Sequence, residues 1–187
     1  MRRFLALAGM CLLCTQVFAT QEFGLRFSDD QLEISYRNML EGSNLAFDAG
    51  WLHHTDNGDV LHAGIHIVDL ASSSRNQLEA GLGGRFVYTN GDLSGQDGYG
   101  FPVGGFVRFT PQRMNRLSLF GSLYYAPDIL SLGDMDNYRE YTLRIGYNVL
   151  RQADIYIGAR YVRGEYDDGL PDVRFDTGMH IGMTLRF

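Results

Sequence analysis

The sequence predicts an all-β fold, and within that class an antiparallel transmembrane β-barrel. Three observations carry this prediction. Apolar and polar residues alternate with a period of two from residue 22 to the C-terminus, half of the alternating segments are nine residues or longer, and the chain ends on Phe187. Strands of soluble proteins usually run about 5–6 residues, whereas a tilted strand that crosses a bilayer needs about 9–11. The segment lengths therefore favour the membrane.

The first nineteen residues have the pattern of a cleaved signal peptide. Two arginines follow the initiator methionine, Phe4–Leu13 is an apolar run too short to span a bilayer, and Val17 and Ala19 supply small residues at a cleavage site. We expect Sec-type export and cleavage after Ala19. Residues 20–187 then form one outer-membrane β-barrel domain.

Cysteine content and charge exclude several classes of function. Cys11 and Cys14 lie within the signal segment, so we expect neither disulfides nor thiolate metal sites in the mature chain. Removing Arg2 and Arg3 takes the formal charge from −6 to −8. A chain this acidic is a poor partner for nucleic acid, whose binding depends on neutralising phosphates. We expect no nucleic-acid partner and no cofactor.

Ten segments carry the alternation. In the first, Phe23, Leu25 and Phe27 alternate with Glu22, Gly24 and Arg26, and the later segments repeat this pattern. The ten segments are 22–27, 32–37, 45–51, 61–67, 78–88, 101–109, 117–125, 141–149, 155–161 and 173–187. An even number of strands places both chain ends on the periplasmic side. Eight strands is the alternative, if the first hairpin or a weak middle strand is miscounted.

The connections between these segments fall into two alternating sets. The first set comprises residues 40–43, 70–75, 111–115 and 150–153. The second comprises residues 28–31, 55–59, 89–98, 127–137 and 167–172, whose last members are longer and rich in Gly, Asp and Pro. Bacterial barrels have short periplasmic turns opposite longer outer loops. No apolar run of about 18 residues follows the signal segment, so a membrane span requires a closed barrel.

A soluble barrel also alternates, and three features decide that the apolar face meets lipid. The polar face carries many full charges mixed with glycines, as suits an ion-paired lumen. Tyrosines occur near strand ends, as an interfacial aromatic girdle requires; they are Tyr88, Tyr99, Tyr125, Tyr138 and Tyr161. The chain ends on Met179, Ile181, Met183, Leu185 and Phe187 in alternation. This ending predicts a C-terminal strand, with Phe187 as the signal that the barrel-assembly machinery reads.

Three stretches resemble the YfaZ family of outer-membrane proteins. They are WLHHTDNGDVLHAGIHI (51–67), GLGGRFVYTNGD with GYGFPVGGFVRF (81–109), and LFGSLYYAPDILSLGDMDNYREYTLRIGY (119–147). The last is the most specific, through its Tyr-Tyr-Ala-Pro-Asp entry into an outer loop. The resemblance implies a barrel in the bacterial outer membrane. The family has no established activity, so the resemblance implies no catalytic residues.

With the apolar set assigned to lipid, the polar set of each strand lines the lumen. The expected cations are Arg26, Arg37, Arg85, Arg108, Arg144, Arg160, Arg174 and Arg186, and the expected anions are Glu22, Glu33, Asp48, Glu79, Glu140 and Asp176. Side chains fill barrels of about eight strands, while water-filled channels have 16–18. We therefore expect a mostly plugged, ion-paired interior. It is either a stabilising network without transport or a narrow path for a solute or ion.

Four of the five histidines fall within fourteen residues: His53, His54, His62 and His66. Directly opposed residues of this hairpin must have numbers with an even sum, because Trp51 and Ile65 share the lipid face. A sum of 116 sets His54 opposite His62, with His66 deeper on the same wall. Such a cluster is a candidate site for zinc, nickel or copper, or for a pH-dependent gate. The alternative is an ordinary solvated hairpin.

The remaining candidates concern the outer loops. Catalysis would need His54 with Asp56 or Asp59 and a serine such as Ser94 or Ser131. Adhesion or ligand binding would use loops 91–100 and 127–137, where Leu130 and Leu132 are apolar. We predict an integral, non-enzymatic outer-membrane barrel, narrow porin-like or envelope-structural. Its expected partners are membrane lipid, lipopolysaccharide and the assembly machinery. A loop-mediated adhesin or a ligand- or metal-binding barrel is the alternative, and an outer-membrane enzyme is less favoured.

Overall fold

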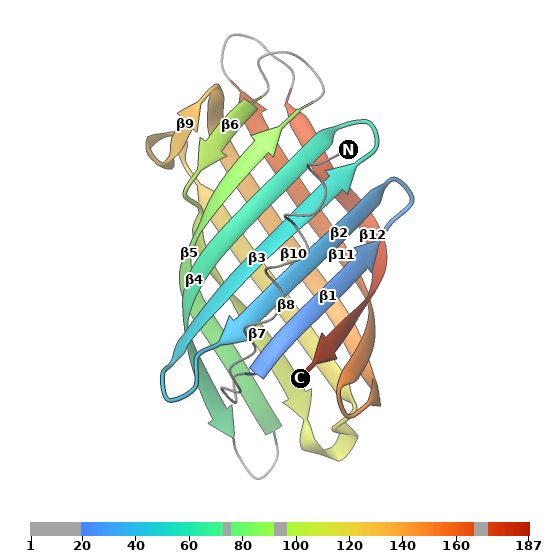
Figure 1. The fold of residues 1–187 in the computed structure, drawn as a ribbon. Coiled ribbons are helices and arrows are strands. Elements are labelled where there is room, and N and C mark those ends of the chain that lie inside the picture. The colour runs from blue at the N-terminus through green and yellow to red at the C-terminus, as the bar shows by residue number, and fades with distance from the viewer. Residues whose placement is uncertain (1–19, 73–75, 92–96, 167–171) are drawn as a thin grey trace, which may run out of the picture.

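The computed structural model describes residues 20–72, 76–91, 97–166 and 172–187. The signal segment with Cys11 and Cys14, and the expected cleavage after Ala19, lie outside these residues. Ten long strands form one closed antiparallel barrel (Figure 1). They are β1 (Thr20–Phe27), β2 (Gln31–Met39), β3 (Leu45–His54), β4 (Gly58–Ser72), β5 (Asn76–Asn90), β7 (Val103–Pro111), β8 (Leu117–Ala126), β10 (Met135–Leu150), β11 (Ala153–Tyr166) and β12 (Val173–Arg186). The all-β prediction and the count of ten are confirmed.

Each strand of the barrel pairs with its neighbours in the chain, and β12 pairs with β1 to close the ring. The closing pairs run from Glu22 opposite Arg186 to Phe27 opposite Ile181. Backbone bonds of 3.0 Å in both directions between Gln21 and Phe187 extend this seam to the end of the chain. The two ends of the barrel chain therefore meet on one rim, which we assign to the periplasm. No helix in the described residues is long and apolar enough to cross a membrane.

Two short strands lie within segments that the sequence pattern assigned to outer loops. β6 (Asp97–Gly100) pairs with the outer half of β5, and β9 (Ser131–Gly133) pairs with β6. Two 3₁₀ turns, η1 (Gln112–Met114) and η2 (Asp128–Leu130), complete the fold. β5 has 15 residues whereas β7 has nine, so the outer half of β5 would otherwise have unpaired backbone groups. β6 covers that edge, since exposed strand edges tend to be covered in native folds.

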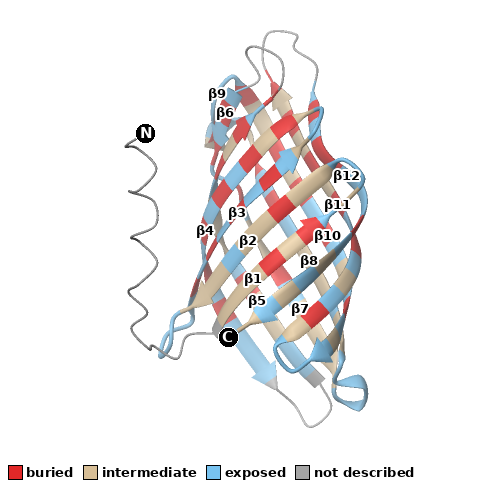
Figure 2. Ribbon diagram, turned by 45° about the vertical axis from the view of Figure 1, so that its right-hand side comes forward, coloured by how far each residue is buried: buried red, intermediate tan, exposed pale blue. Residues whose placement is uncertain are grey.

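The polarity of the barrel is inverted relative to that of a soluble protein. Buried and exposed residues alternate along the strands (Figure 2). Outward-facing Leu82 is 74% exposed and Leu143 is 69% exposed, whereas inward-facing Arg160 is 4% exposed and Glu140 is 3% exposed. Soluble monomers rarely expose contiguous apolar patches larger than a few hundred Å². An apolar belt around a whole barrel therefore requires lipid, and the lipid-facing assignment of the apolar set is confirmed.

The tyrosine prediction holds only in part. Tyr99 and Tyr125 are exposed on the outside, and Tyr141 and Tyr147 add to the outer aromatic residues. Tyr138, however, is completely buried inside the barrel. It shares its parity with Glu140 and Thr142 of β10, whose side chains also face the lumen. Its assignment to the interfacial girdle was wrong, because position near a strand end does not decide which face a side chain joins.

A β-bulge in β12 corrects a second expectation. Val162 of β11 pairs with Asp176, but the next residue, Arg163, pairs with Arg174, so Phe175 is an extra residue in β12. A bulge reverses the alternation beyond it. Phe175 and Asp176 are consequently both buried, and Arg174 is exposed rather than in the lumen. The prediction of an inward Arg174 was wrong for this reason.

Candidate functional site

The middle of the lumen holds a network of ion pairs centred on Glu140 of β10. Its carboxylate lies 2.9 Å from Arg160 Nη2 and 3.3 Å from Arg85 Nη1. Arg160 also pairs with Glu33 and, at 3.6 Å, with Asp176. The network thus joins strands β2, β5, β10, β11 and β12 across the barrel.

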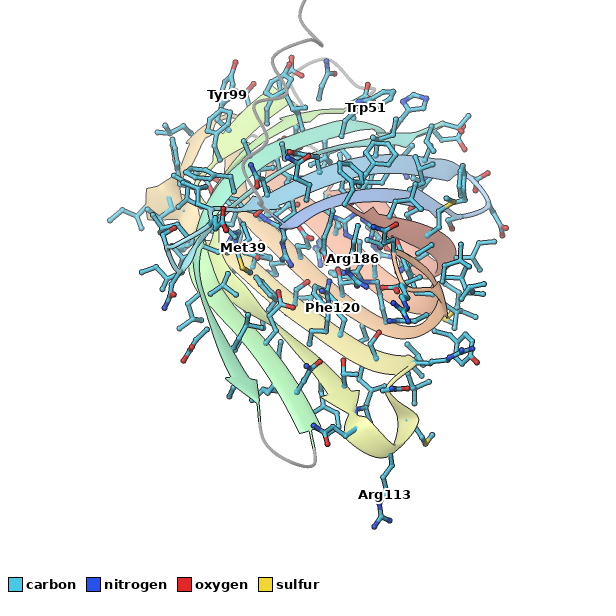
Figure 3. The ribbon with its side chains drawn as sticks, turned by 60° about the horizontal axis from the view of Figure 1, so that its bottom comes forward. Met39, Trp51, Tyr99, Arg113, Phe120 and Arg186 are labelled. Carbon is cyan, nitrogen blue, oxygen red and sulfur yellow. The ribbon has the colours of Figure 1, made fainter. Side chains whose placement is uncertain are left out.

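A second group of ion pairs lies nearer the periplasmic rim and is centred on Glu22 of β1. Glu22 lies 2.9 Å from Arg108 and 2.8 Å from Arg186, and Arg108 also lies 3.2 Å from Glu79. Arg186 binds Asp154 at 2.5 Å. Sequence reasoning missed Asp154, although it has the same parity as Tyr156, Gly158 and Arg160 of β11. Figure 3, viewed from this end, shows Arg186 and Phe120 inside the barrel.

Pairing is what makes so many charges tolerable in this interior. A buried charge is costly unless it is paired and hydrogen-bonded, and removing one member of a buried pair typically destabilises by about 3–5 kcal/mol. Of the fourteen charged residues expected in the lumen, all but Arg174 project into it, among them Arg26, Arg37, Asp48, Glu79, Arg85, Arg108, Glu140, Arg144, Arg160 and Asp176. Ion pairs therefore connect opposite walls of the lumen.

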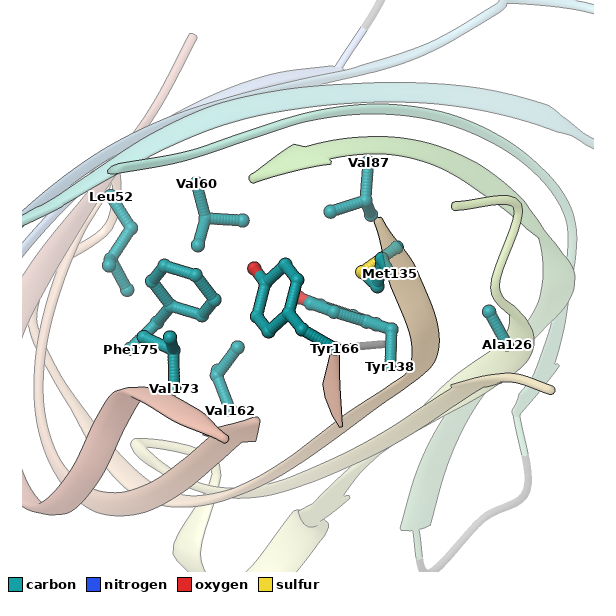
Figure 4. Close-up of a cluster of buried hydrophobic side chains, with 10 residues drawn as sticks. All are labelled: Leu52, Val60, Val87, Ala126, Met135, Tyr138, Val162, Tyr166, Val173 and Phe175. Atoms are coloured by element: carbon teal, nitrogen blue, oxygen red, sulfur yellow. The ribbon is translucent and has the colours of Figure 1, made fainter. Parts of the chain in front are cut away.

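The outer half of the lumen is filled by apolar side chains, which we call the outer plug. Its members are Leu52, Val60, Val87, Ala126, Met135, Tyr138, Val162, Tyr166, Val173 and Phe175. Figure 4 shows these side chains converging from opposite walls inside the barrel. Leu130 of η2 packs against them from the outer side. Tyr166 donates a hydrogen bond of 2.9 Å to Thr89 Oγ1, which ties β11 to β5 within the plug.

The polar part of the lumen is hollow only in places. A central cavity of about 90 Å³ lies among residues that include Arg26, Arg144 and Glu140. A larger cavity of about 360 Å³ lies at the periplasmic end, beside Arg108 and Arg186. The volume thus decreases from the periplasmic rim toward the outer plug.

The β3–β4 hairpin differs from the expected register. Opposed residues sum to 112, not 116, so His62 faces Gly50 and His54 faces Gly58. The even sum was right, but the turn is Thr55-Asp56-Asn57, followed by Gly58 with a φ of +94°. A three-residue hairpin turn commonly ends in such a left-handed residue, which favours glycine. The expected opposition of His54 and His62 was therefore wrong.

The histidines consequently separate into two environments. His66 is fully buried, with Nδ1 2.8 Å from Asp48 Oδ1 and Nε2 2.8 Å from the Tyr124 hydroxyl. His62 Nε2 lies 3.5 Å from the same Asp48. His54 stays in the outer turn, where the Asp56 backbone N–H donates to its Nδ1 at 3.0 Å. Within the described ranges, no group of three or more His, Cys, Asp or Glu side chains is arranged to hold a metal ion.

The residues considered for catalysis are not brought together. Both ring nitrogens of His54 contact its own turn, with Asn57 Nδ2 2.9 Å from Nε2. Asp59 binds His53 and Trp51 on the outer surface instead. Ser131 donates to the Pro127 carbonyl at 3.2 Å, and Ser94 lies outside the described residues.

Comparison with known proteins identifies the family. The family described as "YfaZ precursor" matches residues 1–187, the whole chain. "Outer membrane protein YfaZ" of Escherichia coli (strain K12) is 32% identical over 181 residues, covering 97% of this chain and 96% of that protein. The chain belongs to the YfaZ family. The family resemblance seen in the sequence is confirmed, and this YfaZ-family barrel is an integral protein of the bacterial outer membrane, exported as a precursor.

Solved structures similar to this YfaZ-family barrel include a KdgM porin in complex with disordered oligogalacturonate. It has a TM-score of 0.45 and 7% identity, covering 90% of this chain and 99% of that one. Neisserial surface protein A has a TM-score of 0.37 and 14% identity, covering 90% of this chain and 94% of that one.

Proposed function

We propose that the protein is a narrow, non-enzymatic outer-membrane pore that its own side chains hold closed at the outer end. The observation that carries the proposal is the order of layers along the lumen. A cavity of about 360 Å³ at the periplasmic rim is followed by paired charges and then by the outer plug. Apolar constrictions close channels by excluding water, while charged walls favour polar solutes. This arrangement supports a gated path rather than a permanently open one.

The plug can open without dismantling the barrel. Val173 and Phe175 of β12 and Tyr166 of β11 flank segment 167–171, so they lie beside a connection and not in the middle of the wall. The ion pairs lie deeper and meet the plug through the hydrogen bond from Tyr138, on β10, to Glu140. Movement of a few outer side chains would therefore join the central cavity to the outside.

Planar-bilayer conductance of the refolded mature chain tests the proposal. Folding is first verified by the heat-dependent gel shift that closed barrels show. We expect rare, small steps for the unchanged protein and frequent or larger steps for a variant with a truncated plug. Silence in both would contradict a pore and leave an envelope-structural role.

A second candidate function is binding at the outer hairpins. Ile129 of η2 is 87% exposed and Leu132 of β9 is 57% exposed, although both lie beyond the ten long strands. We propose that this tip contacts the acyl region of lipopolysaccharide. Ile129→Asp would then weaken retention of the folded protein on lipopolysaccharide-containing vesicles, but not on phosphatidylcholine vesicles. Equal retention on both would contradict this contact.

We also propose that the assembly machinery recognises the C-terminal strand through Phe187. Its side chain is 64% exposed, while its backbone is bonded to Gln21. The ring is thus available to a partner before the seam closes, and the finished barrel does not need it.

A further inference from the structure

We propose that the lumen wall around Arg144 and His180 binds a small monovalent anion of chloride size, which enters from the periplasmic rim. The site lies below the outer plug, on β10, β11 and β12. It is independent of whether the barrel conducts, because a site open only to the periplasm can still be occupied.

Arg144 differs from the other inward-facing arginines. In the described part of the chain, Arg26, Arg37, Arg85, Arg108, Arg160 and Arg186 each have a carboxylate oxygen within 4.0 Å. Arg144 has none among the ion pairs of these residues. Its guanidinium carbon instead lies 3.9 Å from the ring centre of Phe120 and 4.8 Å from that of Tyr156. Stacking uses the faces of the guanidinium, and a hydrogen bond to Tyr156 uses part of its edge, so the other N–H groups are able to bind an anion.

His180 is the second independent observation. It is 2% exposed, and within the described residues neither of its ring nitrogens has a hydrogen-bond partner. Its contact with Tyr156 is edge-to-face, with ring centres 5.9 Å apart. Buried polar side-chain atoms nearly always have a partner, so the two ring nitrogens of His180 are available to a ligand.

Gly158 shows that Arg144 and His180 are neighbours. It pairs with Arg144 of β10 on one side and with His180 of β12 on the other. A Cβ atom built on Gly158 would lie 2.7 Å from Arg144 Cγ and also 2.7 Å from His180 Nε2. The two side chains therefore converge over this glycine, which leaves room for both.

Two further donors border the same patch. Arg26 is opposite Gly182, and Arg160 is opposite Gly178, so each is a diagonal neighbour of His180 on the lumen face. Diagonal neighbours are about 7–8 Å apart, within reach of long side chains. The Nε atoms of Arg26 and Arg160 are buried and lack hydrogen-bond partners within the described ranges, while Arg26 Nη2 and Arg160 Nη1 both bind Glu33.

The chemistry of this patch selects an acceptor of hydrogen bonds. Guanidinium N–H groups donate only, and an imidazole can present an N–H as well. A cation would therefore meet hydrogen-bond donors, which do not coordinate it. Glu33 and Glu140 lie close by, so a single negative charge is favoured over a doubly charged phosphate. The adjoining central cavity, about 90 Å³, also favours a small ion.

A series of arginines connects this patch with the periplasm. Arg186 and Arg108 border the periplasmic cavity, and both also border a passage of about 20 Å³ that Arg144 lines. Arg144 then lines the central cavity together with Arg26. An anion entering from this rim passes from one guanidinium to the next, whereas the outer plug blocks the opposite side.

Thermal unfolding of the refolded mature chain in sodium chloride and in sodium gluconate, at equal ionic strength, tests the proposal. A ligand that binds only the folded state raises the Tm as its concentration exceeds its Kd. We expect Tm to rise with the logarithm of the chloride concentration above its Kd, and not to rise with gluconate. Arg144→Gln and His180→Leu should each abolish the difference. Arg139→Gln, which removes an arginine outside the lumen, should retain it.

Crystals grown in bromide provide a measurement that needs no variant. We expect an anomalous peak between the Arg144 guanidinium and the His180 ring. Three results would overturn the proposal: equal Tm values in both salts, a chloride effect that persists in Arg144→Gln, or bromide peaks only outside the lumen. Absence of bilayer conductance would not bear on it, so the pore and the anion site fail separately.

Discussion

The Tyr138 hydroxyl donates a hydrogen bond of 3.0 Å to Glu140 Oε2, although the two residues are only two positions apart on β10. Tyr138 belongs to the outer plug, and Glu140 is the centre of the ion-pair network. This bond therefore joins the apolar layer of the lumen to its charged layer. A substitution in the apolar layer should therefore affect the charged layer, and the reverse.

Truncating the plug should open the lumen. Phe175→Ala removes a completely buried ring, which typically costs about 3–5 kcal/mol of stability. We expect larger or more frequent conductance steps in planar bilayers than with the unchanged protein. Phe86→Ala is the matched control, because it removes the same ring from the outer face. Equal conductance in both variants would contradict the role of the plug.

Glu140→Gln should destabilise the barrel strongly, because it leaves Arg85 without one carboxylate and Arg160 with fewer. Breaking a buried pair typically costs about 3–5 kcal/mol. We expect a lower urea midpoint for unfolding in detergent. Glu165→Gln is the control: Glu165 pairs with the partly exposed Arg139, and such pairs are worth about 1 kcal/mol or less. Similar midpoints for both variants would show that the network contributes little.

Gly182→Ala should be destabilising by about 1–3 kcal/mol, the usual range for overpacking. An added Cβ would lie 2.3 Å from Tyr156 Cζ and 2.6 Å from the Leu25 carbonyl oxygen, so both the ring and the backbone oppose it. Gly84→Ala is the control, since its nearest atom would be the Pro102 oxygen at 3.8 Å. Thermal unfolding of the two variants measures the difference, and no difference would mean that the Tyr156 ring and the Leu25 backbone both shift to accommodate the methyl group.

Phe187→Ser should impair assembly in cells but not refolding in detergent. The backbone pairing of Phe187 with Gln21 does not involve the ring, so the closed seam survives the change. We expect less heat-shifting protein in outer-membrane fractions and a normal yield after refolding. Leu185→Ser, two residues earlier on the same lipid-facing side, tests whether any loss of apolar surface has the same effect. An equal defect in both would argue against specific recognition of Phe187.

The period of two was enough to predict the ten strands and which face meets lipid. Where it failed, a bulge in one strand or the position of one turn was responsible. The extra Phe175 in β12 turns Arg174 outward, and the residue types near it do not predict a bulge. In the β3–β4 hairpin, parity allowed sums of 112 and 116 alike. The turn was decided by the left-handed conformation of Gly58, which a glycine permits but does not require.

The outer plug was predictable in principle but was not predicted. Val162 and Tyr166 continue the inward-facing series of Arg160, so their parity places them in the lumen. Our prediction considered only the charged inward-facing residues, and it therefore described the lumen as ion-paired throughout. The side chains that make the plug come from seven strands, and neighbours in such a cluster cannot be paired from a local pattern.

The backbone hydrogen bonds between Gln21 and Phe187 hold the two ends of the barrel chain side by side. Its strands follow one another around the wall, so the strand pairing does not determine between which two strands the chain termini must lie. A circular permutant that opens in the turn at 40–44 and joins the present ends would retain all ten strand pairings. It would nevertheless finish on β2 rather than on Phe187, and so would separate formation of the barrel from the C-terminal recognition that we propose for Phe187.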